Sequence, residues 1–304
     1  MGHCIFGLLL LFNIIFGLYA QCEDPEVAGP NGNCYWDEEK DGADWYTASS
    51  VCAFVVGDNS VPKVTNAFVN SFLVKLASDL GTTEPFWLSA AVDYSGKWKW
   101  FDSTNLTFTN WAPGEPKNSQ LGYCALFDPQ SGKWRSENCS ATHKSGKTIC
   151  EQFSKGLSHY DKLCPDSKPD DNINYDYSII LNKCLYVQPA SVWGSWELFG
   201  NACQDSGEIK DAKHLSIHDD ITNQWVYGNA QLNEPIFLSI HDPNGDGTFQ
   251  WMDGSKVDYT KWVSPPPAGS CGLMYANSSS WYPTPCDFGF GSQDGTYICQ
   301  APPK

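Results

Sequence analysis

Basic residues are scarce in this chain of 304 residues. It contains 19 Lys and Arg residues against 35 Asp and Glu residues, which gives a formal net charge of −16 at pH 7. Arg135 is the single arginine. A surface with this charge repels nucleic acid and anionic lipid at long range. We therefore expect neither nucleic acid nor a charged membrane surface as a partner.

Long apolar runs are missing after Ala20, and no lipid-anchor signal stands near Lys304. The apolar run near the start covers residues 5–18 and is too short to span a bilayer comfortably. A small residue follows it, as at a cleavage site. We expect residues 1–20 to be a signal peptide and the product to be secreted and extracellular; an uncleaved anchor is the alternative.

Recognisable catalytic motifs are also missing. The sequence contains no G-x-S-x-G elbow, no H-E-x-x-H pair and no glycine-rich phosphate loop. No set of residues is therefore available for a familiar hydrolytic or phosphoryl-transfer reaction. We expect a binding protein and not an enzyme.

Cysteine is abundant, with 13 residues. Cys4 lies within the predicted signal peptide, so its removal leaves an even set of 12. Six disulfides in an oxidising compartment account for all of them, whereas twelve free thiols would be an oxidation hazard. The cysteine count therefore supports secretion independently of the signal peptide.

The cysteines also reveal an internal repeat. Five cysteines of the first half recur in the second half at nearly constant offsets: Cys34, Cys52, Cys124, Cys139 and Cys150 correspond to Cys184, Cys203, Cys271, Cys286 and Cys299. One further cysteine precedes each set, Cys22 and Cys164. Such self-similarity indicates a duplicated structural unit. We predict one domain over residues 21–151, a linker over 152–163 and a second domain over 164–301.

Local patterns are similar in the two halves. Apolar residues at helical spacing predict a helix from Thr65, a candidate N-cap, to Leu80, with Gly81 ending it. Residues 221–232 occupy the corresponding place in the second half. Alternating runs then predict strands over 85–89, 97–101, 235–239 and 248–252. Helices followed by a meander of strands indicate an α+β fold.

Short motifs follow the same order in both halves. In the first half they are Cys34-Tyr-Trp36, Phe86-Trp-Leu-Ser-Ala90, Trp98-Lys-Trp100, Asn110-Trp-Ala-Pro-Gly-Glu-Pro116 and Trp134 before Cys139. In the second half they are Cys184-Leu-Tyr186, Leu215-Ser-Ile-His218, Trp251-Met-Asp-Gly254, Trp262 and Trp281 before Cys286. With this ordered series both halves resemble C-type lectin domains. The resemblance implies two tandem α+β domains, each with two helices, antiparallel strands and a long loop region.

The family resemblance also implies the disulfide pairing, which spacing alone leaves open among 15 arrangements per domain. In the first domain the implied pairs are Cys22 with Cys34, Cys52 with Cys150, and Cys124 with Cys139. In the second domain they are Cys164 with Cys184, Cys203 with Cys299, and Cys271 with Cys286.

The calcium site that sugar-binding members of the family use is poorly preserved here. That site takes oxygen ligands from a Glu-Pro-Asn motif and from Asn and Asp after a Trp, because Ca²⁺ prefers 6 to 8 hard oxygen ligands. The first domain reads Glu115-Pro116-Lys117, and Arg135 and Ser136 follow Trp134. In the second domain 266–268 and 282–283 hold none of these ligands. We expect no cofactor, and in particular no Ca²⁺-dependent sugar binding.

Other residues of the first domain form our candidate binding surface: Glu115, Lys117, Asn118, Trp134 and Arg135. Arg135 and Lys117 could bind a carboxylate or sulfate on an acidic glycan or on a protein. The alternative is that both are solvated or pair with Glu115 and Glu137. Two functions therefore remain open: glycan binding in extracellular or innate-immune recognition, and a protein-binding or structural role in which the lectin fold is only a scaffold.

Three further patterns have simple interpretations. The segment from Asp242 to Asp253 resembles an EF-hand loop, but its place between two predicted strands favours a β-turn. His214 and His218 could chelate Zn²⁺, yet they lie in a strand-like segment that fits the resemblance. Three sequons are candidates for N-glycosylation, at Asn105, Asn138 and Asn277.

Overall fold

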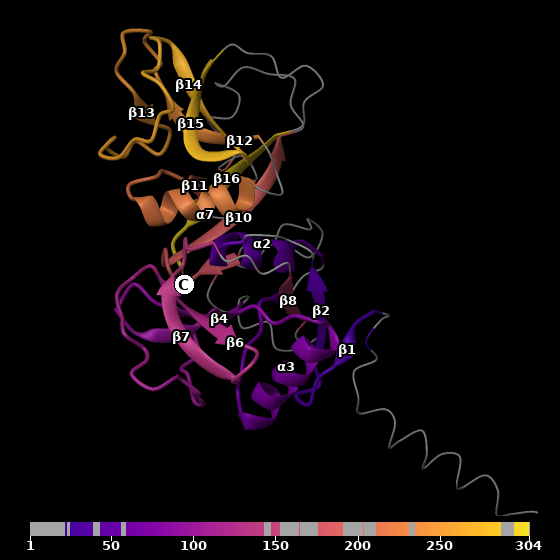
Figure 1. Ribbon diagram of the computed structural model, residues 1–304. Helices are drawn as coiled ribbons and strands as arrows, with labels where there is room; N and C mark the ends of the chain where they lie inside the picture. The colour runs from indigo at the N-terminus through magenta and orange to yellow at the C-terminus, as the bar shows by residue number, and fades with distance from the viewer. Residues whose placement is uncertain are drawn as a thin grey trace, which may run out of the picture.

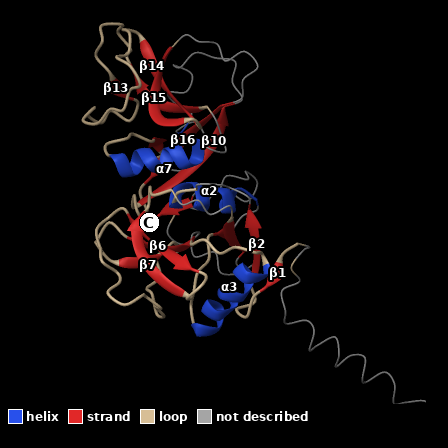
Figure 2. Cartoon of the chain, viewed as in Figure 1, coloured by secondary structure: helices blue, strands red, loops and turns tan. Residues whose placement is uncertain are grey.

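The computed structural model describes residues 22, 25–38, 43–55, 59–142, 147–152, 164, 176–190, 203, 211–230, 235–286 and 295–303. The predicted signal peptide, and the predicted linker after Gln152, lie outside these residues. Within the described part, the helices and antiparallel strands of both halves confirm the α+β prediction. Figures 1 and 2 show the two halves stacked, with the first half at the bottom.

The described strands of the first half form two four-stranded sheets. One sheet has the order β1-β2-β8-β3, from β1 (Val27–Ala28), β2 (Cys34–Glu38), β8 (Thr148–Gln152) and β3 (Asn59–Ser60). The other has the order β5-β4-β6-β7, from β5 (Trp98–Trp100), β4 (Phe86–Val92), β6 (Tyr123–Asp128) and β7 (Lys133–Asn138). The strands predicted over 85–89 and 97–101 correspond to β4 and β5. The second sheet carries the long loop between β5 and β6.

Two helices of the first half are α2 (Trp45–Val55) and α3 (Ala67–Asp79). Asn66 is the N-cap of α3, because its side chain accepts hydrogen bonds from the backbone nitrogens of Phe68 and Val69. The prediction of Thr65 as the cap was therefore wrong by one residue. Gly81 has a φ of 70° just after the helix, where glycine avoids left-handed strain, as expected.

The described strands of the second half form one sheet. Its order is β15-β14-β12-β16-β10-β9, from β15 (Ser278–Pro285), β14 (Ser270–Tyr275), β12 (Ile236–His241), β16 (Gly295–Ala301), β10 (Lys183–Ala190) and β9 (Asp176–Ser178). Strands β11 (Lys213–His214) and β13 (Gln250–Trp251) pair with β16 and β12. Helix α7 (Asp220–Ala230) confirms the helix predicted over 221–232.

Six disulfides link the described residues, and they are the six pairs that the family resemblance implies. The first half contains Cys22–Cys34, Cys52–Cys150 and Cys124–Cys139, and the second half contains Cys164–Cys184, Cys203–Cys299 and Cys271–Cys286. Two of these bonds close loops of 98 and 96 residues. Cross-links of this length restrict the unfolded chain most strongly.

Three apolar clusters form the interior. One lies between α3 and the β5-β4-β6-β7 sheet, and a second lies under α7 in the second half. The third is continuous across both halves and includes Trp45 and Tyr46 of α2 together with Phe237 and Leu273. Its continuity means that the two halves share part of their buried surface, with α2 and α7 facing each other between them (Figure 1).

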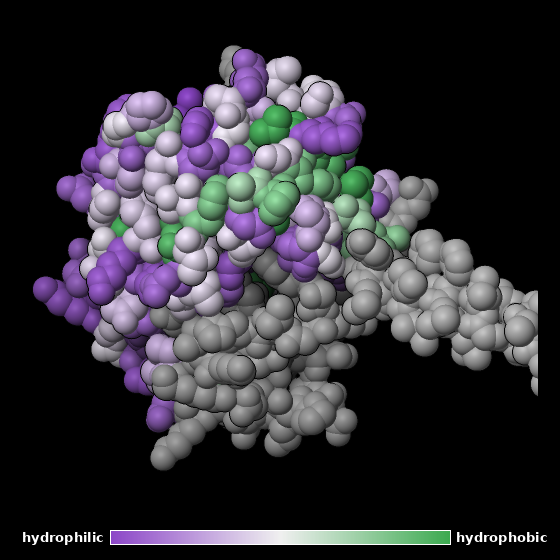
Figure 3. Space-filling model, turned by 90° about the horizontal axis from the view of Figure 1, so that it is seen from below, coloured by the Kyte–Doolittle hydropathy of each residue, from purple (hydrophilic) through white to green (hydrophobic). Residues whose placement is uncertain are grey.

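The face of the described part that carries α3 is mainly polar. Seen from this end, hydrophilic residues predominate, and hydrophobic residues form a narrow band with a few smaller patches beside it (Figure 3). Exposed large apolar side chains are few among the described residues, and Phe68 is the most exposed at 79%. No described helix has both the length and the apolar character needed to cross a membrane.

Candidate functional site

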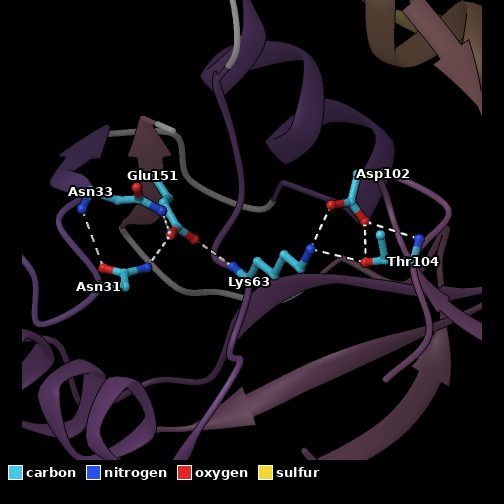
Figure 4. Close-up of polar contacts among 6 residues, drawn as sticks. All are labelled: Asn31, Asn33, Lys63, Asp102, Thr104 and Glu151. Carbon is cyan, nitrogen blue, oxygen red and sulfur yellow. Dashed lines mark hydrogen bonds and ion pairs between the residues drawn. The ribbon is translucent and has the colours of Figure 1, made fainter. Parts of the chain in front are cut away.

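The long loop of the first domain begins directly after β5 and is anchored by Lys63. The Lys63 ammonium forms an ion pair with Asp102 and donates a hydrogen bond of 2.9 Å to the Thr104 hydroxyl (Figure 4). The backbone nitrogen of Thr104 donates to Asp102 at 3.1 Å. Both side chains of the ion pair are only 17% exposed, so water screens it weakly. These contacts fix the direction in which the loop leaves the sheet.

Lys63 also connects this loop to a buried carboxylate, Glu151 on β8. The backbone nitrogen of Lys63 donates to Glu151 at 2.6 Å, and the amides of Asn31 and Asn33 donate at 2.8 and 2.6 Å (Figure 4). The Tyr35 hydroxyl donates a fourth bond at 2.6 Å. Burial raises the pKa of Glu151, while these bonds oppose that shift. Glu151 thus ties the segment before β2 to the base of the loop.

The carboxylate of Glu115, the remaining calcium-ligand residue of the motif, is fully engaged by protein donors. Its Oε2 atom accepts hydrogen bonds from the backbone nitrogen and the hydroxyl of Ser136, at 2.9 and 2.7 Å. The backbone nitrogen of Lys117 donates to the same oxygen at 3.1 Å, and the Lys117 ammonium lies 3.2 Å from Oε1. The side chain of Glu115 is 6% exposed. Burial would raise its pKa, but the bonds from Ser136 and Lys117 lower the pKa to about 2.

Two of the other predicted binding residues, Lys117 and Asn118, lie beside Glu115 and Ser136. The backbone nitrogens of Lys117 and Asn118 donate to the Ser136 hydroxyl at 2.9 and 3.4 Å. Lys117 pairs with Glu115, as one alternative predicted, although its side chain remains 74% exposed. Arg135 is exposed and forms no ion pair with any described residue.

Strand alternation separates the two cations. Successive residues of a strand point to opposite faces, so Arg135 and Ser136 face opposite ways on β7. The Lys117 backbone is on the Ser136 side. The outer edge of β7 is occupied by the long loop itself, because the backbone of Trp134 donates to the Asn110 carbonyl at 3.0 Å and accepts from the backbone nitrogen of Ala112 at 2.8 Å.

Trp134 is fully buried and packs against the long loop of the first domain. Its indole nitrogen donates to the Asn70 side chain at 2.9 Å, and Asn70 in turn donates to the carbonyl of Gly132 at 3.0 Å. Trp134 therefore offers no surface to a ligand. The second domain repeats the contact, since the indole of Trp281 donates to Asn223 at 2.6 Å. Sequence analysis missed both asparagines, although each lies four residues after the residue that caps its helix.

The corresponding loop of the second domain has a different composition. Residues 263–268 carry no charge and contain three prolines, and Val263 is 52% exposed. Asp242 holds the end of this loop, because its carboxylate accepts a hydrogen bond of 2.8 Å from the backbone nitrogen of Gly269. This bond is the main reason that the pKa of Asp242 lies below its usual value.

The EF-hand-like segment is a turn between strands, as predicted. Asp242 accepts hydrogen bonds from the backbone nitrogens of Gly245 and Gly247 at 3.0 and 2.8 Å, and β12 and β13 flank the turn. The two histidines have different surroundings. His214 is buried on β11, whereas His218 contacts Asp258 at 2.7 Å.

Among the described residues, only Cys22, Glu26 and Cys34 are grouped closely enough to suggest a metal site. The two cysteines are bonded to each other, so they offer no thiolate ligand.

All three sequon asparagines are exposed. Asn105 and Thr107 of the first sequon also line an open pocket of about 500 Å³ beside Lys63. Exposure is compatible with a glycan at each position, and glycosylation of these residues remains a prediction.

Comparison with known families agrees with this architecture. A family model described as "Lectin C-type domain" matches residues 41–152 and 194–301, which is most of the chain. The chain belongs to the C-type lectin family. Each match falls in one half, as the cysteine repeat predicts, and the fold prediction is confirmed. Members of this family are binding proteins.

The C-type lectin match is accompanied by similarity to much longer receptors. Human lymphocyte antigen 75 is 25% identical over 268 residues, covering 85% of this chain and 14% of its own length. Mouse C-type mannose receptor 2 is 22% identical over 269 residues, covering 84% of this chain and 17% of its own. The chain therefore spans less than a fifth of either relative.

One solved structure, human lithostathine, is 21% identical with a TM-score of 0.38, covering 44% of this chain and 92% of its own.

Proposed function

We propose that this C-type lectin is a secreted protein that binds glycans without the Ca²⁺ site of the family. The observation that carries the proposal is the closed environment of Glu115. Three hydrogen-bond donors and an ammonium surround its carboxylate, where a calcium site would require further oxygen ligands. If Ca²⁺ took the place of these donors, the Ser136 and Lys117 groups would lose their acceptor. The cost of these lost hydrogen bonds would offset most of what the ion gains by binding Glu115.

The charges around this site favour an acidic glycan. Lys117 is largely exposed despite its pairing, and Arg135 has its planar guanidinium free of ion pairs with the described residues. A guanidinium binds a carboxylate or sulfate through two parallel hydrogen bonds, which gives it geometric selectivity. In a chain with a net charge of −16, both cations lie near the long loop of the first domain, on opposite sides of β7.

A glycan array tests the proposal. The secreted protein would be applied with Ca²⁺ and again with EDTA, on an array that includes sialylated and sulfated glycans. We expect binding to acidic glycans that is unchanged by EDTA and reduced at least tenfold in Arg135→Gln. Lys75→Gln, which removes an exposed charge on α3, is the matched control and should bind normally. Binding that EDTA abolishes would contradict the proposed site.

A second candidate function is protein binding by the second domain. Its 263–268 loop is uncharged, rich in proline and partly apolar at Val263, and it replaces a sugar site with a surface of low conformational freedom. An array without any glycan signal would favour this candidate. Val263→Asp would then be expected to weaken capture of the protein partner while Arg135→Gln would not.

A further inference from the structure

We propose that the two lectin domains form one rigid binding body, in which α7 of the second domain docks on α2 of the first through a surface centred on Gly228. This inference goes beyond the proposed function, because it concerns how the two loop regions are held and not which ligand they bind. A short polar linker alone would let the two domains move independently. The contacts between the helices indicate otherwise.

Gly228 allows the two helices to approach closely. A Cβ atom at this position would lie 2.8 Å from the Cβ atom and 2.9 Å from the carbonyl carbon of Tyr46, and 3.1 Å from the backbone nitrogen of Thr47. Two of these atoms belong to the backbone, and the third is fixed to it, so no side-chain rotation could relieve the overlap. Only glycine fits at this position of the observed interface.

A glycine within a helix is costly for the helix itself, since it has a low helix propensity. The equivalent helix of the first domain shows what the same position carries without an interface. Gly228 lies five residues after Asn223, and Lys75 lies five residues after the matching Asn70. The Lys75 side chain is 73% exposed and pairs with Asp79 on its own helix. The glycine is therefore specific to the docked copy.

Neighbouring residues extend the same contact. Ile221 of α7 packs toward Gly122 of the first domain, where an added Cβ would lie 3.5 Å from the Ile221 side chain. Its counterpart on α3 is Phe68, which is 79% exposed. Burial raises the pKa of Tyr46, and the charges of Asp44, Asp219 and Asp220 raise it further. Because Asp219 and Asp220 belong to the second domain, this effect also reflects the close approach of the two domains.

The interface has a consequence for recognition. With α2 and α7 docked, the loop that carries Lys117 and the loop over 263–268 keep a fixed relative orientation. A ligand that contacts both loops must match this geometry. Because the two domains are already ordered relative to each other, binding does not require a further loss of entropy to order them. The tandem copy therefore acts as a single recognition surface.

The test uses two variants of the full chain, each of which carries at one position the residue found at the matching position of the other helix. Gly228→Lys introduces the residue that the first domain carries, and Lys75→Gly makes the reverse change. If the domains are docked, Gly228→Lys should lower the melting temperature by about 3–8 °C. It should also increase the radius of gyration in small-angle X-ray scattering. Hydrogen exchange should accelerate in α2, which lies in the other domain.

A rise in the melting temperature of Gly228→Lys, instead of a fall, would overturn the proposal. In domains that move independently, Gly228→Lys would only improve the α7 helix and would raise the melting temperature by about 2–4 °C. The radius of gyration and the exchange of α2 would then match those of the wild type. Lys75→Gly should leave the radius of gyration and the hydrogen exchange of α2 unchanged, whether or not the domains are docked. Gly228→Ala, which adds only a methyl group, gives the same comparison if the lysine variant is poorly secreted.

Discussion

The Oε2 atom of Glu115 lies 2.9 Å from the backbone nitrogen of Ser136 and 2.7 Å from its hydroxyl oxygen. In sugar-binding relatives the residues at these two positions are both expected to offer oxygens to Ca²⁺. Here Ser136 donates two hydrogen bonds to Glu115, so it acts as a donor where a calcium ligand would offer a lone pair. A carboxylate that is satisfied by N–H and O–H donors keeps its negative charge without a metal ion.

The first prediction follows from the pKa of Glu115, which is lowered to about 2 in the folded protein. A group with a depressed folded pKa stabilises the protein above its unfolded pKa, and this contribution is lost as the pH falls toward the folded value. The window therefore lies between about pH 4.5 and pH 2. We expect Glu115→Gln to cost about 1–2 kcal/mol at pH 7 and little at pH 2.

Denaturant unfolding at pH 7, 4 and 2 would measure this difference. Glu137→Gln is the control, because among the described residues the Glu137 side chain accepts a bond only from the neighbouring backbone nitrogen of Asn138. A loss of stability in Glu115→Gln that is equally large at pH 2 and pH 7 would contradict the role assigned to the carboxylate.

The second prediction concerns calcium itself. We expect millimolar Ca²⁺ to leave the melting temperature of the wild type unchanged. In the triple variant Lys117→Asn, Arg135→Asn, Ser136→Asp, the oxygen ligands of the family motif are restored. Without the ion, the carboxylate introduced by Ser136→Asp and that of Glu115 would repel each other and lower the stability. With Ca²⁺ at about 100 times its dissociation constant, binding should add about 2.7 kcal/mol.

Differential scanning fluorimetry with Ca²⁺, Mg²⁺ and EDTA would detect these shifts. A wild-type melting temperature that rises with Ca²⁺ and falls with EDTA would show that the protein binds the ion. The triple variant is the positive control, and a calcium-dependent shift confined to it would agree with our interpretation of the loop.

The third prediction separates the two kinds of disulfide in the first domain. Cys52–Cys150 closes a loop of 98 residues, and Cys124–Cys139 closes one of 15. Loop-closure entropy assigns about 4–5 kcal/mol to the first and about 3 kcal/mol to the second. We expect Cys52→Ala with Cys150→Ala to abolish secretion of folded protein. Cys124→Ala with Cys139→Ala should be secreted at a reduced level with an altered binding loop.

Secretion level and near-ultraviolet circular dichroism would compare the two pairs. A Cys52→Ala, Cys150→Ala protein that is secreted and melts like the wild type would contradict the importance of the long closure. The same comparison with Cys203–Cys299 and Cys271–Cys286 would test whether the second domain obeys the same rule.

Much of the fold could be predicted because its signals are local or repeated. Five cysteines of the first half recur in the second at nearly constant offsets, the amphipathic pattern of α3 is regular, and the strands begin at the expected motifs. The family resemblance then supplied the pairing. The cap of α3 was misplaced because Thr65 and Asn66 are both good capping residues, and only the three-dimensional contact selects Asn66.

Other features depend on long-range contacts that no local pattern encodes. Glu151 binds donors that are more than 80 residues away in sequence, and Gly228 contacts a helix of the other domain. A glycine in a helical pattern is an ambiguous signal, because it can mark a close approach or simply a weak helix. Likewise, Ser136 could be recognised as a missing ligand from sequence, but its donation to Glu115 required the structure.

The last prediction concerns the asparagine that supports each loop. The indole nitrogens of Trp134 and Trp281 donate to Asn70 and Asn223, and all four residues are buried. Replacing either asparagine with leucine would leave the buried indole N–H without its acceptor. The Gly132 carbonyl would still accept a hydrogen bond from Asn110, at 2.7 Å. We expect Asn70→Leu and Asn223→Leu each to cost about 1–3 kcal/mol. Denaturant unfolding would measure the loss, and a double-mutant cycle with Trp134→Phe would isolate the pair: full additivity of Asn70→Leu and Trp134→Phe would mean that the hydrogen bond contributes nothing.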